Sequence, residues 1–176
     1  ERLNFLPVII ENSVMADAVE IARLYESARD LQKIKGAVCW PLFDKKLIET
    51  EITEGRQWKI VIDTQIACVW ATTFSDPQIW EERNADASVY IHRIATNPIY
   101  RGQNLVKEIV RWAKVYAEKN EKEFIRLDTV GENKELIRHY QKCGFDFLGI
   151  FNLTNTDQLP AHYHNAGVSL FQMKVN

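Results

Sequence analysis

The feature of the sequence that most constrains the fold is a strand–helix–strand unit. The segment SVYIHRIAT (88–96) is rich in β-branched and aromatic residues, and Asn97-Pro98 would stop a strand there. An amphipathic helix follows Gly102, and FIRLDTV (124–130) then predicts a second strand. Strands joined by a helical crossover run parallel, and the crossover is right-handed. The helix after Gly102 therefore starts at the edge of the sheet where α/β folds bind ligands.

The other segments predict a single α/β (α+β) domain over residues 1–176, with a mixed, mostly antiparallel central sheet flanked by about four helices. Apolar residues at helical spacing and capping residues indicate the helices, and short apolar runs indicate the strands. Besides the helix after Gly102, the expected helices cover 14–33 with Ser13 as cap, 45–54 with Asp44 as cap, and 133–143. The remaining expected strands cover 6–10, 58–63, 65–74, 145–151 and 168–175.

Composition excludes several classes of protein. The chain has 176 residues, of which 46% are hydrophobic and 26% charged, and its net charge is −2 with scattered Lys and Arg, so no face for nucleic acid is expected. No apolar run approaches the ~20 residues of a membrane span, and no segment has the pattern of a signal peptide. Cys39, Cys68 and Cys143 are far apart and odd in number, which favours a reducing, cytoplasmic setting without disulfides.

The turn YRGQNL (100–105) has the properties of an anion site. The first turn of a helix has free N–H groups and the positive end of the helix dipole. Gly102 permits a close approach or a positive φ, and the Arg101 guanidinium suits a phosphate. Taken alone, the segment is equally consistent with an ordinary helix start.

The next helix places two further polar side chains near this turn. Asn133 stands at its N-cap position, and Tyr140 lies seven residues further on, which is ~10 Å along the same face. A long ligand with phosphates at the first helix would pass Asn133 and bring its other end to Tyr140. Each residue has a simpler role when it is considered alone, because Asn133 would cap the helix and Tyr140 would pack.

Taken together, two stretches make the chain resemble the GNAT superfamily of acyl-CoA-dependent N-acetyltransferases. They are YIHRIATNPIYRGQNLVKEIV (90–110) and LDTVGENKELIRHYQKCGF (127–145). The family pattern has a strand, a Y-R-G turn, a small-residue pyrophosphate loop, and a later Asn before a helix that ends Y-x-x-x-G-F. The loop departs from the pattern at Asn104 and Val106. Asn tolerates left-handed conformations, so Asn104 can replace a small residue, and Val106 is expected to pack inward.

The resemblance implies acetyl-CoA or coenzyme A as co-substrate and no metal. Residues at the end of the first strand would pair with the pantetheine arm: Ile94, Ala95 and Thr96. The pyrophosphate would be bound by the loop residues Arg101, Gly102, Gln103, Asn104, Leu105 and Val106. Asn133 would contact the cofactor arm, and Tyr140 would lie beside the sulfur.

The chemistry requires a neutral amine, a donor for the developing oxyanion, and a proton for the leaving sulfur. Backbone N–H groups near Ile94 or Ala95 are candidates for the oxyanion donor. Tyr140 is the candidate acid or hydrogen-bond donor, although a phenol of pKa ~10 transfers a proton to a thiolate of pKa ~8.5 only with help. His92 is the candidate base, on one strand face with Tyr90 and Ile94. An ordinary strand histidine is the alternative.

Other functions stay open at this point. The altered loop also fits a non-catalytic acyl-CoA-binding or regulatory module of the same fold. His162 and His164 form a weak metal motif that a metal-dependent hydrolase would use. Independently of that motif, Asp128 would be either an acid that supports the catalytic residues or the cap of a turn. The acceptor is a small-molecule amine or a protein N-terminus. A homodimer through sheet edges is a further expectation from the resemblance.

Overall fold

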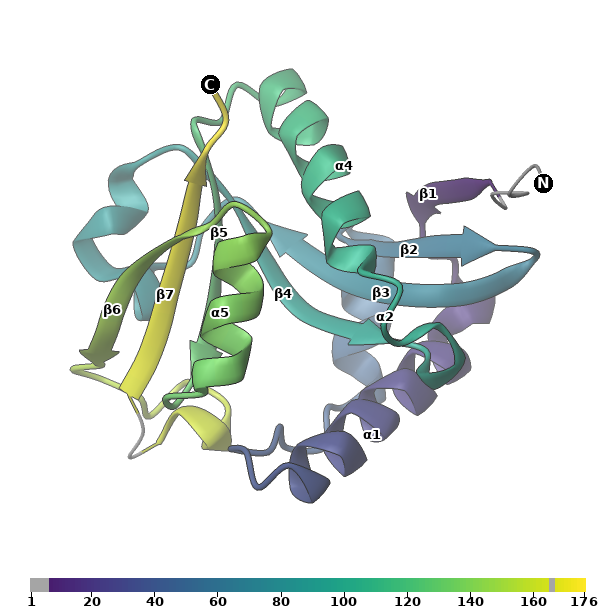
Figure 1. Ribbon diagram of the computed structural model, residues 1–176, viewed down its shortest axis with the longest axis horizontal. Coiled ribbons are helices and arrows are strands. Elements are labelled where there is room, and N and C mark those ends of the chain that lie inside the picture. Colours follow the sequence, from purple (N-terminus) through teal and green to yellow (C-terminus); the bar gives the residue numbers. More distant parts are fainter. Residues whose placement is uncertain (1–6, 165–166) are drawn as a thin grey trace.

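Seven strands form one sheet in the computed structural model, which describes residues 7–164 and 167–176 (Figure 1). Their order is β1-β2-β3-β4-β5-β7-β6, and all neighbours are antiparallel except the parallel pair β4 and β5. The strands are β1 (Val8–Asn12), β2 (Gln57–Ile62), β3 (Gln65–Thr73), β4 (Ser88–Thr96), β5 (Phe124–Val130), β6 (Asp146–Asn152) and β7 (Gly167–Lys174).

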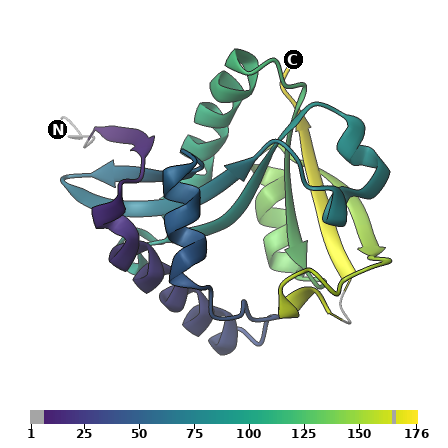
Figure 2. The ribbon, with the colours of Figure 1, turned by 180° about the vertical axis from the view of Figure 1, so that it is seen from behind.

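Helices cover both faces of this sheet. The helices are α1 (Ala18–Ile34), α2 (Lys45–Thr53), the short α3 (Pro77–Trp80), α4 (Leu105–Lys119) and α5 (Lys134–Lys142). Helices α4 and α5 lie on one face, and α1 and α2 lie on the other, as Figures 1 and 2 show from opposite sides. The predicted fold class is confirmed, with α3 as an addition. Within the described residues, no helix is long and apolar enough to cross a membrane.

The predicted caps differ in outcome. Asp44 caps α2 as predicted, because its carboxylate accepts a hydrogen bond from the Lys46 N–H at 3.0 Å. The Ser13 cap was wrong. The Asp17 carboxylate accepts a hydrogen bond from the Val14 N–H at 2.8 Å, and the chain first makes a 3₁₀ turn, η1 (Met15–Asp17). The α-helix therefore starts later than expected, and the Ser13 hydroxyl makes no hydrogen bond to any described residue.

Each face of the sheet has its own apolar core. The apolar stripe of α4 is buried against the strands, and α5 adds to the same cluster: Leu105, Ile109, Val110, Ala113, Ala117, Ile137 and Tyr140. On the opposite face, α1 and α2 bury a smaller cluster that includes Ile21, Leu24, Tyr25 and Ile48. The two layers hold the sheet between them and fix where the strand ends lie.

Strand β4 contains a β-bulge. Arg93 and Ile94 together lie opposite Trp70, between the pairs that His92 and Ala95 make with β3. Arg93 has a φ of +51°, a left-handed conformation that is unusual for a residue with a side chain. The extra residue interrupts the alternation of side chains along the strand.

This bulge corrects one prediction about His92. Tyr90 packs in a cluster on the α1 and α3 side of the sheet, whereas Ile94 packs against the cluster under α4. The expectation that His92 shares a face with both residues is therefore wrong for Ile94. One inserted residue reverses the faces of all residues that follow it, and the sequence pattern does not reveal the insertion.

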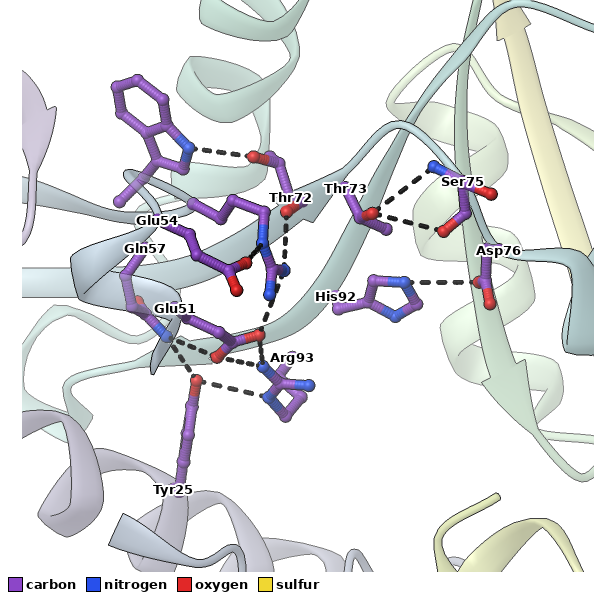
Figure 3. Close-up of polar contacts among 12 residues, drawn as sticks. Tyr25, Glu51, Glu54, Gln57, Thr72, Thr73, Ser75, Asp76, His92 and Arg93 are labelled. Carbon is purple, nitrogen blue, oxygen red and sulfur yellow. Dashed lines mark hydrogen bonds and ion pairs between the residues drawn. The ribbon is translucent and has the colours of Figure 1, made fainter. Parts of the chain in front are cut away.

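The Arg93 side chain links the bulge to both helices of its face (Figure 3). Its Nη2 donates to both carboxylate oxygens of Glu51 on α2, and its Nε donates to the Tyr25 hydroxyl on α1 at 3.3 Å. The guanidinium also lies 5.2 Å from the centre of the Phe43 ring. Because the Glu51 side chain is only 4% exposed, this pair is a buried ion pair.

Strands β4 and β5 separate immediately before the bulge. They pair from Ser88 with Phe124 to Ile91 with Leu127, and no pair follows. Strand β5 continues along β7 to Val130, while β4 bends away with β3. A gap between two parallel strands therefore begins at the middle of the sheet.

Removing the Glu51 carboxylate should destabilise the fold, because Arg93 would keep a buried charge without its partner. We expect Glu51→Ala to lower the free energy of unfolding by about 3 kcal/mol or more, measured by urea denaturation. Glu54→Ala is the matched control, since Glu54 is 51% exposed in its ion pair with Arg56, and it should cost less than about 1 kcal/mol. Equal losses in the two variants would contradict this account of the bulge.

Candidate active site

A cavity of about 370 Å³ lies at the N-terminus of α4. It is lined by Thr96, Tyr100, Arg101, Gly102, Asn104, Leu105, Val106 and His139. Strand β4, the loop before α4, and α5 thus meet here, and most residues predicted to contact a cofactor lie together. Their role in binding stays a prediction.

The loop before α4 has a conformation that suits an anion. Gly102 has a φ of +85°, and Asn104 is left-handed with φ +53° and ψ +50°, as expected for an Asn in place of a small residue. The N–H groups of Gly102, Asn104, Leu105 and Val106 donate no hydrogen bond to any described residue. Free N–H donors and the positive end of the dipole of the 15-residue helix α4 are features that favour an anion, and the binding of a phosphate here stays a prediction.

The remaining loop side chains lie around this site. Arg101 is exposed, and its Nη2 donates to the Ser27 carbonyl of α1 at 3.4 Å. Gln103 is exposed and does not line the cavity. Val106 packs against the core cluster that contains Val110, as predicted. Valine at position 106, in place of the small residue of the family pattern, therefore leaves the backbone N–H groups of the loop free.

On α5, the two predicted residues differ in what they contact. The Asn133 side-chain oxygen accepts a hydrogen bond from the Leu136 N–H at 3.1 Å, so it caps the helix. Tyr140 is buried, with its ring 5.2 Å from that of Phe171, and its hydroxyl forms no hydrogen bond with the described residues. Burial raises the pKa of Tyr140 above its ordinary value, so the phenol keeps its proton at neutral pH.

The β4 residues that were predicted to pair with a cofactor follow the bulge. Ala95 is buried under α1, and Ile94 and Thr96 lie on the α4 side, where Thr96 lines the cavity. Because β5 has already separated, the edge of β4 that faces β5 has no strand partner over these residues. Its backbone donors and acceptors are available to a ligand that enters the gap.

A second polar cluster lies where the strands separate, on the α1 and α3 side. Three polar side-chain atoms, a carboxylate oxygen from each of Asp76 and Asp128 and a ring nitrogen of His92, all lie within 4.8 Å of one another. The nearer carboxylate oxygen of Asp76 is 3.3 Å from His92 Nε2, as Figure 3 shows. Asp128 Oδ2 accepts a hydrogen bond of 2.7 Å from the Tyr163 hydroxyl.

The charges of this cluster influence one another. Burial by itself lowers the pKa of His92, but the contact with Asp76 and the charges of Asp76 and Asp128 raise it above its ordinary value. Burial raises the pKa of Asp128 to about 6, although the charge of His92 lowers it. Buried titratable groups whose pKa values are shifted by specific charged neighbours mark this cluster as a candidate functional site.

Sequence reasoning had named His92 as a candidate base and Asp128 as a possible supporting acid, but it had neither brought them together nor identified Asp76 and Tyr163. Asp76 and Tyr163 lie in connecting segments far from His92 in the chain, and no local pattern points to them. The position of Asp128 follows from the parallel register, since Ile91 pairs with Leu127 and the next residues on each strand are His92 and Asp128. A correct strand alignment would have been sufficient to find that pair.

The His162–His164 motif does not gather a metal site. Among the described residues, neither histidine belongs to a group of three possible ligands. The His162 ring packs against Phe43 and Tyr163, and burial together with the charge of Arg93 lowers its pKa to about 4. A hydrolase that uses these two histidines as metal ligands therefore gains no support from the described residues.

The sequence is similar to those of known acetyltransferases. The sequence model described as "Acetyltransferase (GNAT) family" matches residues 38–145. The uncharacterized N-acetyltransferase YesJ of Bacillus subtilis (strain 168) is 27% identical over 145 residues, which cover 78% of this chain and 81% of YesJ.

Solved structures show the same fold. A GNAT family acetyltransferase from Listeria monocytogenes 4b F2365 superposes with a TM-score of 0.77 at 24% identity, covering 96% of this chain and 95% of the other. YncA from Salmonella typhimurium, solved with its cofactor acetyl-CoA, gives a TM-score of 0.66 at 14% identity, with 96% and 94% covered. Because the family model spans more than half of the residues and the fold agrees, the chain belongs to the GNAT family of acetyltransferases.

Proposed function

We propose that the protein transfers an acetyl or other small acyl group from acetyl-CoA to a primary amine, by direct attack within a ternary complex. The observation that carries the proposal is the gap between β4 and β5, which joins two chemically different places. On the α4 side lies the loop with free N–H groups, and on the other side lies the cluster of Asp76, His92 and Asp128. The acceptor is a small-molecule amine or a protein N-terminus.

The loop before α4 is the predicted pyrophosphate site. Four backbone N–H groups are free there, and the position that a Cβ would take on Gly102 has no atom within 4 Å, so a phosphate can approach the backbone. A cofactor with its phosphates at this place would extend along the unpaired edge of β4, at Ile94 to Thr96, towards Tyr140. Members of this family use acetyl-CoA, and YncA was solved with it bound.

His92 is the proposed base. With Asp76 beside Nε2, the tautomer that carries its proton on Nε2 is favoured, which leaves Nδ1 free to accept a proton. Nδ1 forms no hydrogen bond with any described residue, so its lone pair remains to accept a proton from an acceptor amine. Asp76 is a positioning residue in this scheme, since it acts through the ring of His92.

Direct attack fits the state of the cysteines better than a covalent enzyme intermediate. Cys68 is fully buried, and burial raises its pKa to about 12. Burial also raises the pKa of Cys143, although Lys107 lowers it. Thiols in this state are poor nucleophiles, because the thiolate is the reactive form.

The proposed reaction accounts for every bond and proton. The acceptor ammonium gives one proton to His92, and the neutral nitrogen attacks the thioester carbonyl, so that a C–N bond forms and the C–S bond breaks. The nitrogen loses a second proton, the sulfur takes one up, and one proton leaves to solvent. Tyr140 stabilises the leaving sulfur by a hydrogen bond, because its raised pKa makes full proton transfer unfavourable.

The direct test measures thiol release from acetyl-CoA with a panel of amines: butylamine, spermidine, lysine, methionine and an alanyl peptide. The wild type should form an acetylated amine. Tyr140→Phe should bind CoA with unchanged affinity but reduce kcat about tenfold to a hundredfold, because one hydrogen bond to a charged sulfur is lost. Tight CoA binding without transfer to any amine would instead indicate a binding module, and an unchanged kcat in Tyr140→Phe would exclude its role.

The conformation of Asn104 should control cofactor affinity. Asn104→Ala places a residue that disfavours the left-handed region at this position, at a cost of about 1–2 kcal/mol, so CoA should bind about tenfold more weakly. Asn104→Gly is the matched variant and should keep the affinity, since glycine adopts this conformation freely. Calorimetric titration with CoA measures both. Equal losses in the two variants would mean that the side chain, and not the backbone, is required.

The pH dependence should report on His92. A base acts in its unprotonated form, so the rate should rise with pH through the His92 pKa, which lies above the ordinary value. His92→Ala should remove this rise and lower the plateau by on the order of 10²-fold or more. His164→Ala, a change of an exposed histidine, is the control and should keep the profile. A profile that is unchanged in His92→Ala would exclude His92 as the base.

A further inference from the structure

Asp128 has no role in the proposed reaction so far, although it lies in the same cluster as His92. It is the first residue of β5 beyond the last parallel pair, so its carboxylate stands at the start of the gap. Its Oδ2 accepts the hydrogen bond from Tyr163, and its Oδ1 accepts none from any described residue. The side chain is only partly buried, so one carboxylate oxygen is held in position with free lone pairs.

The groups that face Asp128 come from several elements. His92 lies beside it on β4, Asp76 in the segment before α3, and Tyr163 in the loop between β6 and β7. Arg93, also on β4, acts on the pKa of His92, and burial together with the charge of Asp128 raises the pKa of Tyr140 on the other face of the sheet. Glu51 already neutralises Arg93, because it accepts both hydrogen bonds of Nη2. Two aspartates then face the single histidine, so the net charge at the start of the gap is negative even when His92 is protonated.

We propose that Asp128 binds the ammonium group of the acceptor at Oδ1 and holds it beside His92 Nδ1. This inference rests on the proposed function and specifies its acceptor as an amine that arrives as a cation and has an unhindered nitrogen. A primary ammonium group has three N–H donors. One donates to Asp128, one donates to His92, and the carbon substituent points away from the gap.

The arrangement accounts for both binding and proton transfer. The ammonium group binds best while it is charged, and a carboxylate is a stronger acceptor than a neutral group. When His92 takes the proton, the neutral nitrogen keeps its hydrogen bond to Asp128, so its lone pair can turn towards the gap. The Tyr163 hydroxyl holds the carboxylate in this orientation, and it ties the loop before β7 to the site.

The test compares Asp128→Asn with the wild type, using the panel amine that the wild type acetylates fastest and saturating acetyl-CoA. The KM for the amine should rise about tenfold to a hundredfold, because an ionic hydrogen bond becomes a neutral one, while the KM for acetyl-CoA stays the same. Glu123→Gln is the matched control, since it makes the same change of charge at an exposed position before β5, and it should leave both constants unchanged.

An unchanged KM for the amine in Asp128→Asn would overturn the inference and leave the proposed function intact. If the wild type acetylates no amine, the proposed function fails and this inference fails with it. A rise in the KM for acetyl-CoA equal to that for the amine would also overturn it, because that result indicates a general disturbance of the site.

A second measurement does not need a substrate. Titration of the histidine rings by NMR should show a lower His92 pKa in Asp128→Asn than in the wild type, because a negative neighbour of His92 has been removed. The His164 pKa serves as the internal reference. If the His92 pKa is the same in both proteins, the carboxylate does not act on this ring and the inference is wrong.

Discussion

The buried ion pair between Arg93 and Glu51 is the interaction on which the site depends. A left-handed conformation at a residue with a side chain costs roughly 1–3 kcal/mol, and it persists only where the surroundings enforce it. Helix α2 supplies the carboxylate of Glu51, and α1 supplies the hydroxyl of Tyr25, so both helices of that face hold the bulge. The bulge follows directly after the last pair of β4 with β5, at the point where β4 bends away with β3 and the gap begins.

The gap divides the chemistry between the two faces of the sheet. Free backbone N–H groups and the positive end of a helix dipole lie on the α4 side, and both favour a negatively charged group. Titratable side chains lie on the other side, where Asp76 and Asp128 favour a cation. In the proposed reaction, two substrates of opposite charge would approach one another from opposite faces and meet between the strands. Tyr140 lies on the α4 side, where the proposal places the leaving sulfur.

The sequence allowed the order of the long elements, the parallel pair and the loop before α4 to be predicted, because each depends on local signals. The apolar stripe of α4, the cap at Asp44 and the tolerance of Asn104 for a positive φ are properties of neighbouring residues. The bulge at Arg93 was not predicted, since its cause is a carboxylate on a helix 42 residues away. For the same reason Asp76 and Tyr163 were missed, because loops bring Asp76 to His92 and Tyr163 to Asp128.

A crystal structure of the protein with bound acetyl-CoA tests the central claim most directly. The account predicts that the pyrophosphate accepts hydrogen bonds from the N–H groups of residues 102–106. It also predicts that the thioester lies in the gap between β4 and β5. Its sulfur should lie within hydrogen-bonding distance of the Tyr140 hydroxyl, and its carbonyl carbon should face the side of the gap on which His92 lies. A cofactor bound elsewhere, or one whose thioester lies outside the gap, would contradict the account.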